Sequence, residues 1–277
     1  IFIDCTANMG TTIYNLPFLF KLSPKVDLLK LKSAIEKVIE AHKYLKVKLF
    51  MDKSGEIKQR RNDDEIFKIE IKDGSNISKN DLVKPFNLFG ERLARFAIYR
   101  THKGSHLFID IHHLIADGTS YEIILNDIER AYNGEDLEKE TYTSYEAALD
   151  NAEAIKTNLY EKSEKFYDSI FKDCGGNTDF KTNLSYPKKG AKPGLGLLKI
   201  AGNKLKPEMV KQICKKYGIT ENIFFNGVFG ALLASAISVD KSIFTTIYHG
   251  RNDSRLTNAV GMFVKTLPVL CDVSKDT

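Results

Sequence analysis

The stretch from His106 to Gly118 reads His-Leu-Phe-Ile-Asp-Ile-His-His-Leu-Ile-Ala-Asp-Gly and joins a strand pattern to the start of a helix. Side chains alternate between the two faces of a strand, so His113 points to the same face as Ile111 and His112 points to the opposite face. The two adjacent histidines therefore cannot chelate one metal ion together. The apolar residues before them predict a buried strand that carries this pair to its end.

The end of this strand has groups suited to proton transfer. A histidine there, followed by the tight Asp117-Gly118 turn and a helix N-terminus, is well placed as a general base, because imidazole with a pKa of about 6.5 is mostly neutral near pH 7. The helix start supplies backbone N–H groups and a positive dipole end for a carboxylate or a developing oxyanion. Taken singly, such a histidine is more often a hydrogen-bonded core residue, and such an aspartate a turn or capping residue. Only their combined spacing points to chemistry.

Strand and helix patterns alternate on both sides of this stretch. Asp27 is expected to cap a helix whose apolar residues, from Leu28 to Val38, recur at steps of three and four. The sequence Thr119-Ser120-Tyr121-Glu122 is a capping box and predicts a helix that begins two residues beyond Asp117. Further helices are expected at 145–172, 207–217 and 221–237, a hairpin turn at 52–55, and strands at 14–21, 45–49, 67–71, 92–100, 106–113, near 197, 243–248 and 260–270. This mixture predicts an α/β fold, and the stretch from Cys174 to Pro193 is the best linker candidate.

Composition excludes several classes of protein. With 277 residues, 43% of them hydrophobic, the chain is long enough to bury a sizeable core. The net charge of +5 is spread along the sequence, so nucleic acid binding is not expected; the excess fits docking to an acidic partner, and solvated lysines explain it as well. The four cysteines have no C-x-x-C spacing, which speaks against a zinc site or a redox pair. No apolar run reaches the length of a membrane span, and we expect a cytoplasmic protein.

Both ends of the chain look cut. It begins at Ile1 without an initiator Met and ends at Thr277 just after a strand-like run. We therefore expect a piece of a longer protein.

The motif His112-His113-x-x-x-Asp117-Gly118 resembles the H-H-x-x-x-D-G motif of nonribosomal peptide synthetase condensation domains, which are relatives of chloramphenicol acetyltransferase. Epimerisation domains and other acyltransferases share all or part of this motif. Further stretches resemble the family's motifs in the same order: residues 41–48 its R-H-E-x-L-R-T-x, residues 85–88 its P-F-D-L, and residues 260–268 its I-G-x-F-V-N-T-L-P, with Gly250-Arg251 matching the usual G-R. The resemblance covers nearly the whole chain.

The resemblance implies a fold class: α/β, with two-layer lobes like chloramphenicol acetyltransferase and the active site in a tunnel between them. Residues 1–175 would form the nearly complete N-terminal lobe with the motif, and residues 176–277 a linker and part of the C-terminal lobe. The first family motif is incomplete before Ile1 and the later motifs are missing, so the fragment by itself is expected to be inactive or nearly so.

The resemblance also implies a reaction and its partners. The donor is an acyl or peptidyl thioester on the 4'-phosphopantetheine arm of one carrier protein, and the acceptor is the α-amine of an aminoacyl group on a second carrier protein, with an adenylation domain adjacent. No cofactor or metal is bound directly. His113 would accept a proton from the attacking amine or position it, and the Gly118 N–H would face the oxyanion. Asp117 would hold the turn, and His112 would be a packing or hydrogen-bonding residue.

Three positions depart from the family pattern. Lys46 stands where the family usually has an Arg that is thought to pair with the motif Asp, so the resemblance suggests a Lys46–Asp117 salt bridge without the bidentate fork of an arginine. A solvated strand face is an equal explanation for this lysine. Lys265 replaces the usual Asn, and Val47 replaces Thr. These departures bear on activity more than on fold.

Other functions share the same pattern. One is an epimerisation domain or a stand-alone acyltransferase that uses a coenzyme A or carrier thioester. Another is a non-catalytic, condensation-like docking module. The Thr266-Leu267-Pro268 sequence after Lys265 favours condensation modestly.

Overall fold

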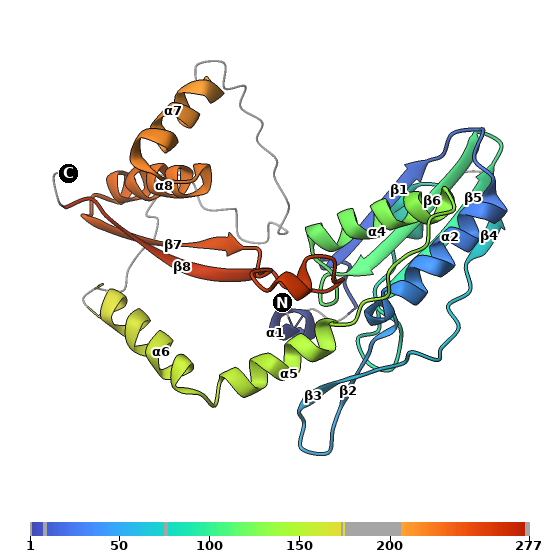
Figure 1. Ribbon diagram of the computed structural model, residues 1–277, viewed down its shortest axis with the longest axis horizontal. Helices are drawn as coiled ribbons and strands as arrows, with labels where there is room; N and C mark the ends of the chain where they lie inside the picture. The colour runs from blue at the N-terminus through green and yellow to red at the C-terminus, as the bar shows by residue number, and fades with distance from the viewer. Residues whose placement is uncertain (1, 8–9, 75–76, 173, 175–205, 275–277) are drawn as a thin grey trace, which may run out of the picture. The chain divides into compact units, whose positions relative to one another are not determined.

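The computed structural model describes residues 2–7, 10–74, 77–172, 174 and 206–274 (Figure 1). By its internal contacts the chain forms two compact units. The first contains residues 1–157 and 249–264, and the second contains residues 158–248 and 265–277. Residues 249–264 thus belong to the first unit, although the segments on either side of them in the sequence belong to the second.

The main sheet of the first unit runs in the order β1 (Asn15–Lys21), β6 (Gly104–His112), β5 (Ala94–Thr101) and β4 (Glu70–Asp73). The pairs β1–β6 and β5–β6 are antiparallel, whereas β4 and β5 are parallel. The β1–β6 register places Asn15 opposite His112. The histidine pair therefore lies where the central strand β6 ends. A separate hairpin is formed by β2 (Lys48–Met51) and β3 (Ile57–Arg60).

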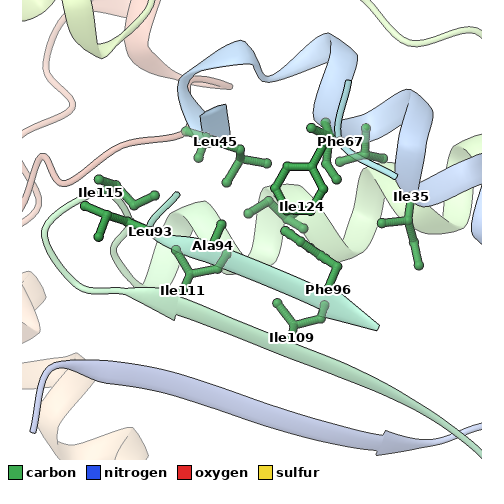
Figure 2. Close-up of a cluster of buried hydrophobic side chains, with 14 of the residues drawn as sticks. Ile35, Leu45, Phe67, Leu93, Ala94, Phe96, Ile109, Ile111, Ile115 and Ile124 are labelled. Atoms are coloured by element: carbon green, nitrogen blue, oxygen red, sulfur yellow. The ribbon is translucent and has the colours of Figure 1, made fainter. Parts of the chain in front are cut away.

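Two helices, α2 (Leu28–Ala41) and α4 (Gly118–Tyr132), contact each other and contribute to the core of this unit (Figure 2). Ile35 of α2, Ile124 of α4 and Ile109 of β6 are fully buried together. Burying an isoleucine side chain stabilises a fold by about 1.5–3 kcal/mol, so these contacts fix α4, and hence the turn before it, against the end of β6. The α2 helix begins where expected, because the Asp27 carboxylate accepts hydrogen bonds from the N–H groups of Leu29 and Lys30.

The rest of the first unit comprises short elements: α1 (Phe2–Ala7), the 3₁₀ turns η1 (Lys43–Lys46) and η2 (Ser254–Leu256), α3 (Lys79–Leu82) and α5 (Ser144–Ala154). The second unit contains α6 (Asn158–Phe171), α7 (Pro207–Tyr217), α8 (Glu221–Ile237) and the antiparallel strands β7 (Lys241–Tyr248) and β8 (Lys265–Asp272). Gly230 lets α8 approach β8 closely, because a Cβ there would lie 2.4 Å from the Cβ of Cys271.

Most predicted elements are confirmed, and the exceptions have local causes. The helix expected over 145–172 is broken, because Thr157 bonds back to the Ala154 carbonyl through both its N–H and its hydroxyl. The strand expected over 260–270 begins only at Lys265, since the backbone N–H groups of Val260, Gly261 and Phe263 bond side chains of the first unit. The first two residues of the strand predicted at 45–49 lie in the turn η1, and the observed strand β2 begins at Lys48.

Some sequence-based predictions fall outside the part of the chain that can be described. The strand near Leu197 and most of the linker candidate lie outside the described residues. The domain boundary at residue 175 stays a prediction. Within the described ranges, no single helix is long and apolar enough to cross a membrane; only the bent pair α7–α8, with 98° between its helices, has the necessary length and composition.

Candidate active site

His113 lies directly after β6, and its ring is oriented by the turn that follows. The backbone N–H of His113 donates to the Tyr14 carbonyl at 2.8 Å, which extends the β1–β6 pairing by one residue. The ring Nδ1 lies 2.8 Å from the Ala116 carbonyl oxygen. Because a carbonyl oxygen only accepts, this contact places a hydrogen on Nδ1, so in the neutral ring the lone pair lies on Nε2. The half-buried imidazole is therefore held in the tautomer that a base requires.

His112 occupies a different environment. It is 5% exposed, its Nδ1 accepts the Leu114 N–H at 3.1 Å, and its ring packs edge-on against Phe86 with 5.8 Å between centroids. Its Nε2 lies 3.9 Å from the sulfur of Cys5. Burial lowers the pKa of His112 to about 4, so the ring is neutral at physiological pH and engaged in packing.

Asp117 caps α4 from a fully buried position. Its Oδ1 accepts hydrogen bonds from the N–H and hydroxyl of Ser120, both at 2.8 Å, and its Oδ2 accepts the Phe263 N–H at 3.1 Å. The helix therefore begins at Gly118, one residue before the predicted start, because Asp117 itself is the N-cap. An ion pair completes the site: Nη2 of Arg251 lies 2.9 Å from Oδ1 of Asp117.

Arg251 connects this cap to residues 249–264. Its Nη1 donates to the carbonyls of Leu256 at 2.8 Å and Ala259 at 2.6 Å, and its guanidinium lies 4.5 Å from the centre of the Phe263 ring. Only 6% of the side chain is exposed. A forked, planar cation is needed here, because one group bonds a carboxylate and two carbonyls in different directions. The turn that holds His113 is thereby fixed from both sides.

Comparison with known proteins shows the family of this chain. The family model described as "Condensation domain" matches residues 6–277. The chain belongs to the condensation domain family. The prediction made from the His112–Gly118 motif is thus confirmed at the level of the family.

Two sequence relatives of this condensation-family chain are named as synthases. It is 27% identical over 259 residues to Tyrocidine synthase 3 of Brevibacillus parabrevis, covering 92% of this chain, and 28% identical over 263 residues to Surfactin synthase subunit 2 of Bacillus subtilis, covering 93%. The matched regions span only 4% and 7% of the lengths of those two relatives.

Solved structures show the same fold. The first condensation domain of the calcium-dependent antibiotic synthetase, in complex with a substrate analogue, matches with a TM-score of 0.69 at 15% identity over 98% of this chain and 67% of that chain. The epimerization domain from the third module of tyrocidine synthetase B matches with a TM-score of 0.63 at 19% identity over 98% and 66%. These likenesses confirm the α/β, chloramphenicol acetyltransferase-like fold class.

Lys46 of this condensation-family chain does not pair with Asp117, and that prediction is wrong. Lys46 is 1% exposed, and its ammonium bonds Glu40 and, at 3.0 Å, the Asp63 carbonyl. It lies in η1, directly after α2, which places it beside the last turn of that helix. Arg251 takes the pairing role instead. The Gly250-Arg251 match to the family's G-R was the signal that would have found it.

Gly118 opens α4 with an exposed backbone, and a Cβ there would contact nothing within 4 Å. The structure thus brings His113, Asp117 and Gly118 into one turn and adds Arg251 and Ser120, which the sequence did not single out. Among the residues that the structure describes, no group of three His, Cys, Asp or Glu side chains is arranged to hold a metal ion.

Proposed function

We propose that this chain takes part in amide bond formation between two carrier-bound substrates. The donor is an acyl or peptidyl thioester on the 4'-phosphopantetheine arm of one carrier protein, and the acceptor is the aminoacyl thioester on another. An adenylation domain in the same cytoplasmic synthetase activates the amino acid. The Nδ1–Ala116 hydrogen bond supports this proposal most directly, because it leaves Nε2 of His113 able to accept or position a proton.

In the proposed step the α-amine attacks the thioester carbonyl, a C–N bond forms and the C–S bond breaks. The amine loses its proton to Nε2 of His113, and the same proton passes to the departing thiolate, which becomes the phosphopantetheine thiol while His113 returns to its neutral form. The Gly118 N–H, at the positive end of α4, stabilises the oxyanion of the tetrahedral intermediate. Asp117 holds the turn and does not exchange a proton, and His112 is a neutral packing residue.

Much of the rate would come from holding both tethered substrates together, because a well-oriented pair reacts as if at very high concentration. We expect little activity from the 277 residues alone. The chain covers 67% of the matched condensation domain structure, and we expect the remainder to contribute to the surface that holds the two arms. Assays therefore use a polypeptide that extends this chain to the length of that domain.

A two-carrier assay tests the proposal. One carrier is loaded with an acyl or aminoacyl thioester and the other with an aminoacyl thioester, and transfer is followed by intact-protein mass spectrometry. Condensation predicts that the second carrier gains the mass of the donor group and that the first carrier becomes a free thiol. Transfer to a free alcohol with no acceptor carrier would instead identify a stand-alone acyltransferase.

An epimerisation domain is the second candidate, because such a domain is among the similar structures. It would exchange the α-hydrogen of a single carrier-bound substrate for deuterium from solvent without any transfer. A docking module would do neither, and replacing His113 with alanine would leave the product yield of the whole synthetase unchanged.

A further inference from the structure

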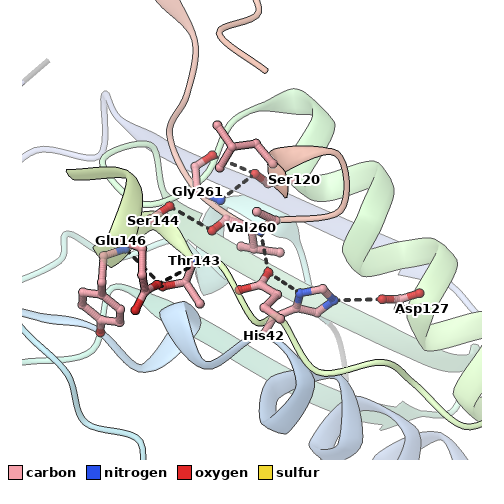
Figure 3. Close-up of polar contacts among 12 residues, drawn as sticks. His42, Ser120, Asp127, Thr143, Ser144, Glu146, Val260 and Gly261 are labelled. Atoms are coloured by element: carbon pink, nitrogen blue, oxygen red, sulfur yellow. Dashed lines mark hydrogen bonds and ion pairs between the residues drawn. The ribbon is translucent and has the colours of Figure 1, made fainter. Parts of the chain in front are cut away.

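His42 lies buried between two carboxylates (Figure 3). It is 2% exposed and lies just after α2. Its Nε2 is 2.8 Å from Oδ2 of Asp127 on α4, and its Nδ1 is 2.6 Å from Oε1 of Glu140. Ionised carboxylates only accept hydrogen bonds, so each of the two contacts requires a hydrogen on its ring nitrogen. The geometry is that of an imidazolium.

Glu140 links His42 to the candidate active site through hydrogen bonds. The same Oε1 atom accepts the N–H of Val260 at 2.6 Å. The next residue, Gly261, donates its N–H to the Ser120 hydroxyl oxygen at 3.0 Å, and Ser120 in turn bonds the Asp117 carboxylate. Hydrogen bonds on either side of the Val260–Gly261 peptide bond thus connect the buried histidine to the cap of α4, and Figure 3 shows most of them.

We propose that His42 is a positioning residue: as an imidazolium it fixes Glu140 so that residues 259–263 stay bound to the N-terminus of α4. This deepens the proposed function and rests on it, since the turn being held is the one that presents His113. His42 itself touches no substrate. The consequence is a turn whose order depends on the charge of a histidine outside the His112–Gly118 motif.

The charges around His42 favour its protonated form. Asp127 faces it from α4 and Glu140 from the segment after α4, while the guanidinium of Arg130 lies beyond, 3.0 Å from the other oxygen of Asp127. Burial by itself lowers the pKa of His42, but the hydrogen bonds to the two carboxylates outweigh burial and raise the pKa to about 9. The ring is therefore charged at neutral pH and loses its charge only in alkaline solution.

Loss of the His42 proton removes the charged partner of Glu140, so detachment of residues 259–263 is expected to become easier as the pH rises through about 9. Amide hydrogen exchange at Val260 and Gly261, divided by the intrinsic rate at each pH, reports this directly. The amide of Ala234, which is buried in α8 of the second unit, serves as the internal reference, because core amides of the first unit follow the pH dependence of that unit's overall stability.

The experiment uses the 277-residue chain and needs no enzymatic activity. The His42 ring is titrated by NMR in the unaltered chain, and the protection of Val260 and Gly261 is measured from pH 6 to pH 10. The expected result is a ring that titrates well above 7, with protection that falls over the same pH range by at least tenfold. A His42 ring that titrates near 6.5, or protection that stays flat, overturns the proposal.

Two variants separate positioning from general stability. His42→Gln is expected to lower the protection of Val260 at pH 7 to its alkaline level and to flatten the profile. His102→Gln, at an exposed histidine in the β5–β6 turn, is the matched control and leaves the profile unchanged. If His42→Gln does not fold, Glu140→Gln is used in its place. This substitution keeps an acceptor for the Val260 N–H but removes one of the two negative charges that face His42. An unshifted profile in Glu140→Gln contradicts the proposal.

Because the readout is hydrogen exchange, a negative result for the role of His42 can be told apart from a negative result for the proposed function. A chain that transfers no acyl group can still show the pH-dependent protection. Conversely, an active condensation domain with a flat profile would keep the function of His113 and remove the role of His42.

Discussion

Replacing Arg251 with alanine removes the partner of a fully buried carboxylate. Asp117 is 0% exposed and Arg251 only 6%, so little water reaches the gap that the substitution leaves. Breaking a buried ion pair from one side costs about 3–5 kcal/mol, because the remaining charge is left without compensation. The carbonyls of Leu256 and Ala259 also lose their donor. We therefore expect the free energy of unfolding of the first unit to fall by about 3–5 kcal/mol.

The matched control is Arg255→Ala, in the same segment. Arg255 is 53% exposed and pairs with Asp253 and Asp150 on the surface, where an ion pair contributes about 0–1 kcal/mol. Urea unfolding is followed by circular dichroism, because the sequence has no tryptophan. Arg251→Lys should lie between alanine and wild type, since an ammonium lacks the fork that reaches both Asp117 and the carbonyls. If Arg251→Ala and Arg255→Ala differ by less than about 1 kcal/mol, the buried pair does not hold the turn.

Two further predictions concern packing and pH. Gly230→Ala should destabilise the second unit by about 1–3 kcal/mol in urea unfolding, because the new methyl group overlaps Cys271. Gly227→Ala on the same helix is the control: its methyl group meets no atom within 4 Å, so the change should be neutral or stabilising by up to about 1 kcal/mol. Equal effects of the two substitutions would refute the close approach of α8 to β8. The raised pKa of His42 contributes stability that is fully present below pH 6.5 and is lost as pH rises through about 9. Urea midpoints should therefore fall between pH 7 and pH 10 in the parent chain, by an amount equivalent to roughly 3 kcal/mol, and His42→Gln should remove most of that fall.

The local part of this structure was predictable from local patterns. The strand that ends at His112 and the helix capped by Asp27 follow from the alternation and periodicity of their own residues. The helix α8 likewise covers the predicted residues 221–237, and Thr220 caps it. Each of these elements buries one face and begins at a side chain that satisfies its first N–H groups, so neighbouring residues carry enough information.

The long-range pairings were not predictable in the same way. Asp117 and Arg251 are 134 residues apart, and nothing in either segment specifies the other. The resemblance suggested Lys46 as the partner, and the error came from carrying over a pairing to a residue that lies beside Glu40 instead. Residues 260–263 look like part of a strand because most of them are apolar, yet the N–H groups of Val260, Gly261 and Phe263 bond side chains of the first unit. Which distant segment a residue packs against decides these pairings, and a single sequence does not reveal that.

The central claim is that His113 performs the proton chemistry of acyl transfer between two carriers. Its most direct test is the single-turnover rate in the two-carrier assay, comparing His113→Ala with the parent polypeptide extended to the length of the matched condensation domain. Loss of a positioned base lowers such rates by about 10²- to 10⁴-fold. We predict a loss in that range with unchanged folding by circular dichroism. A His113→Ala protein that transfers the donor group within threefold of the parent rate would contradict the claim.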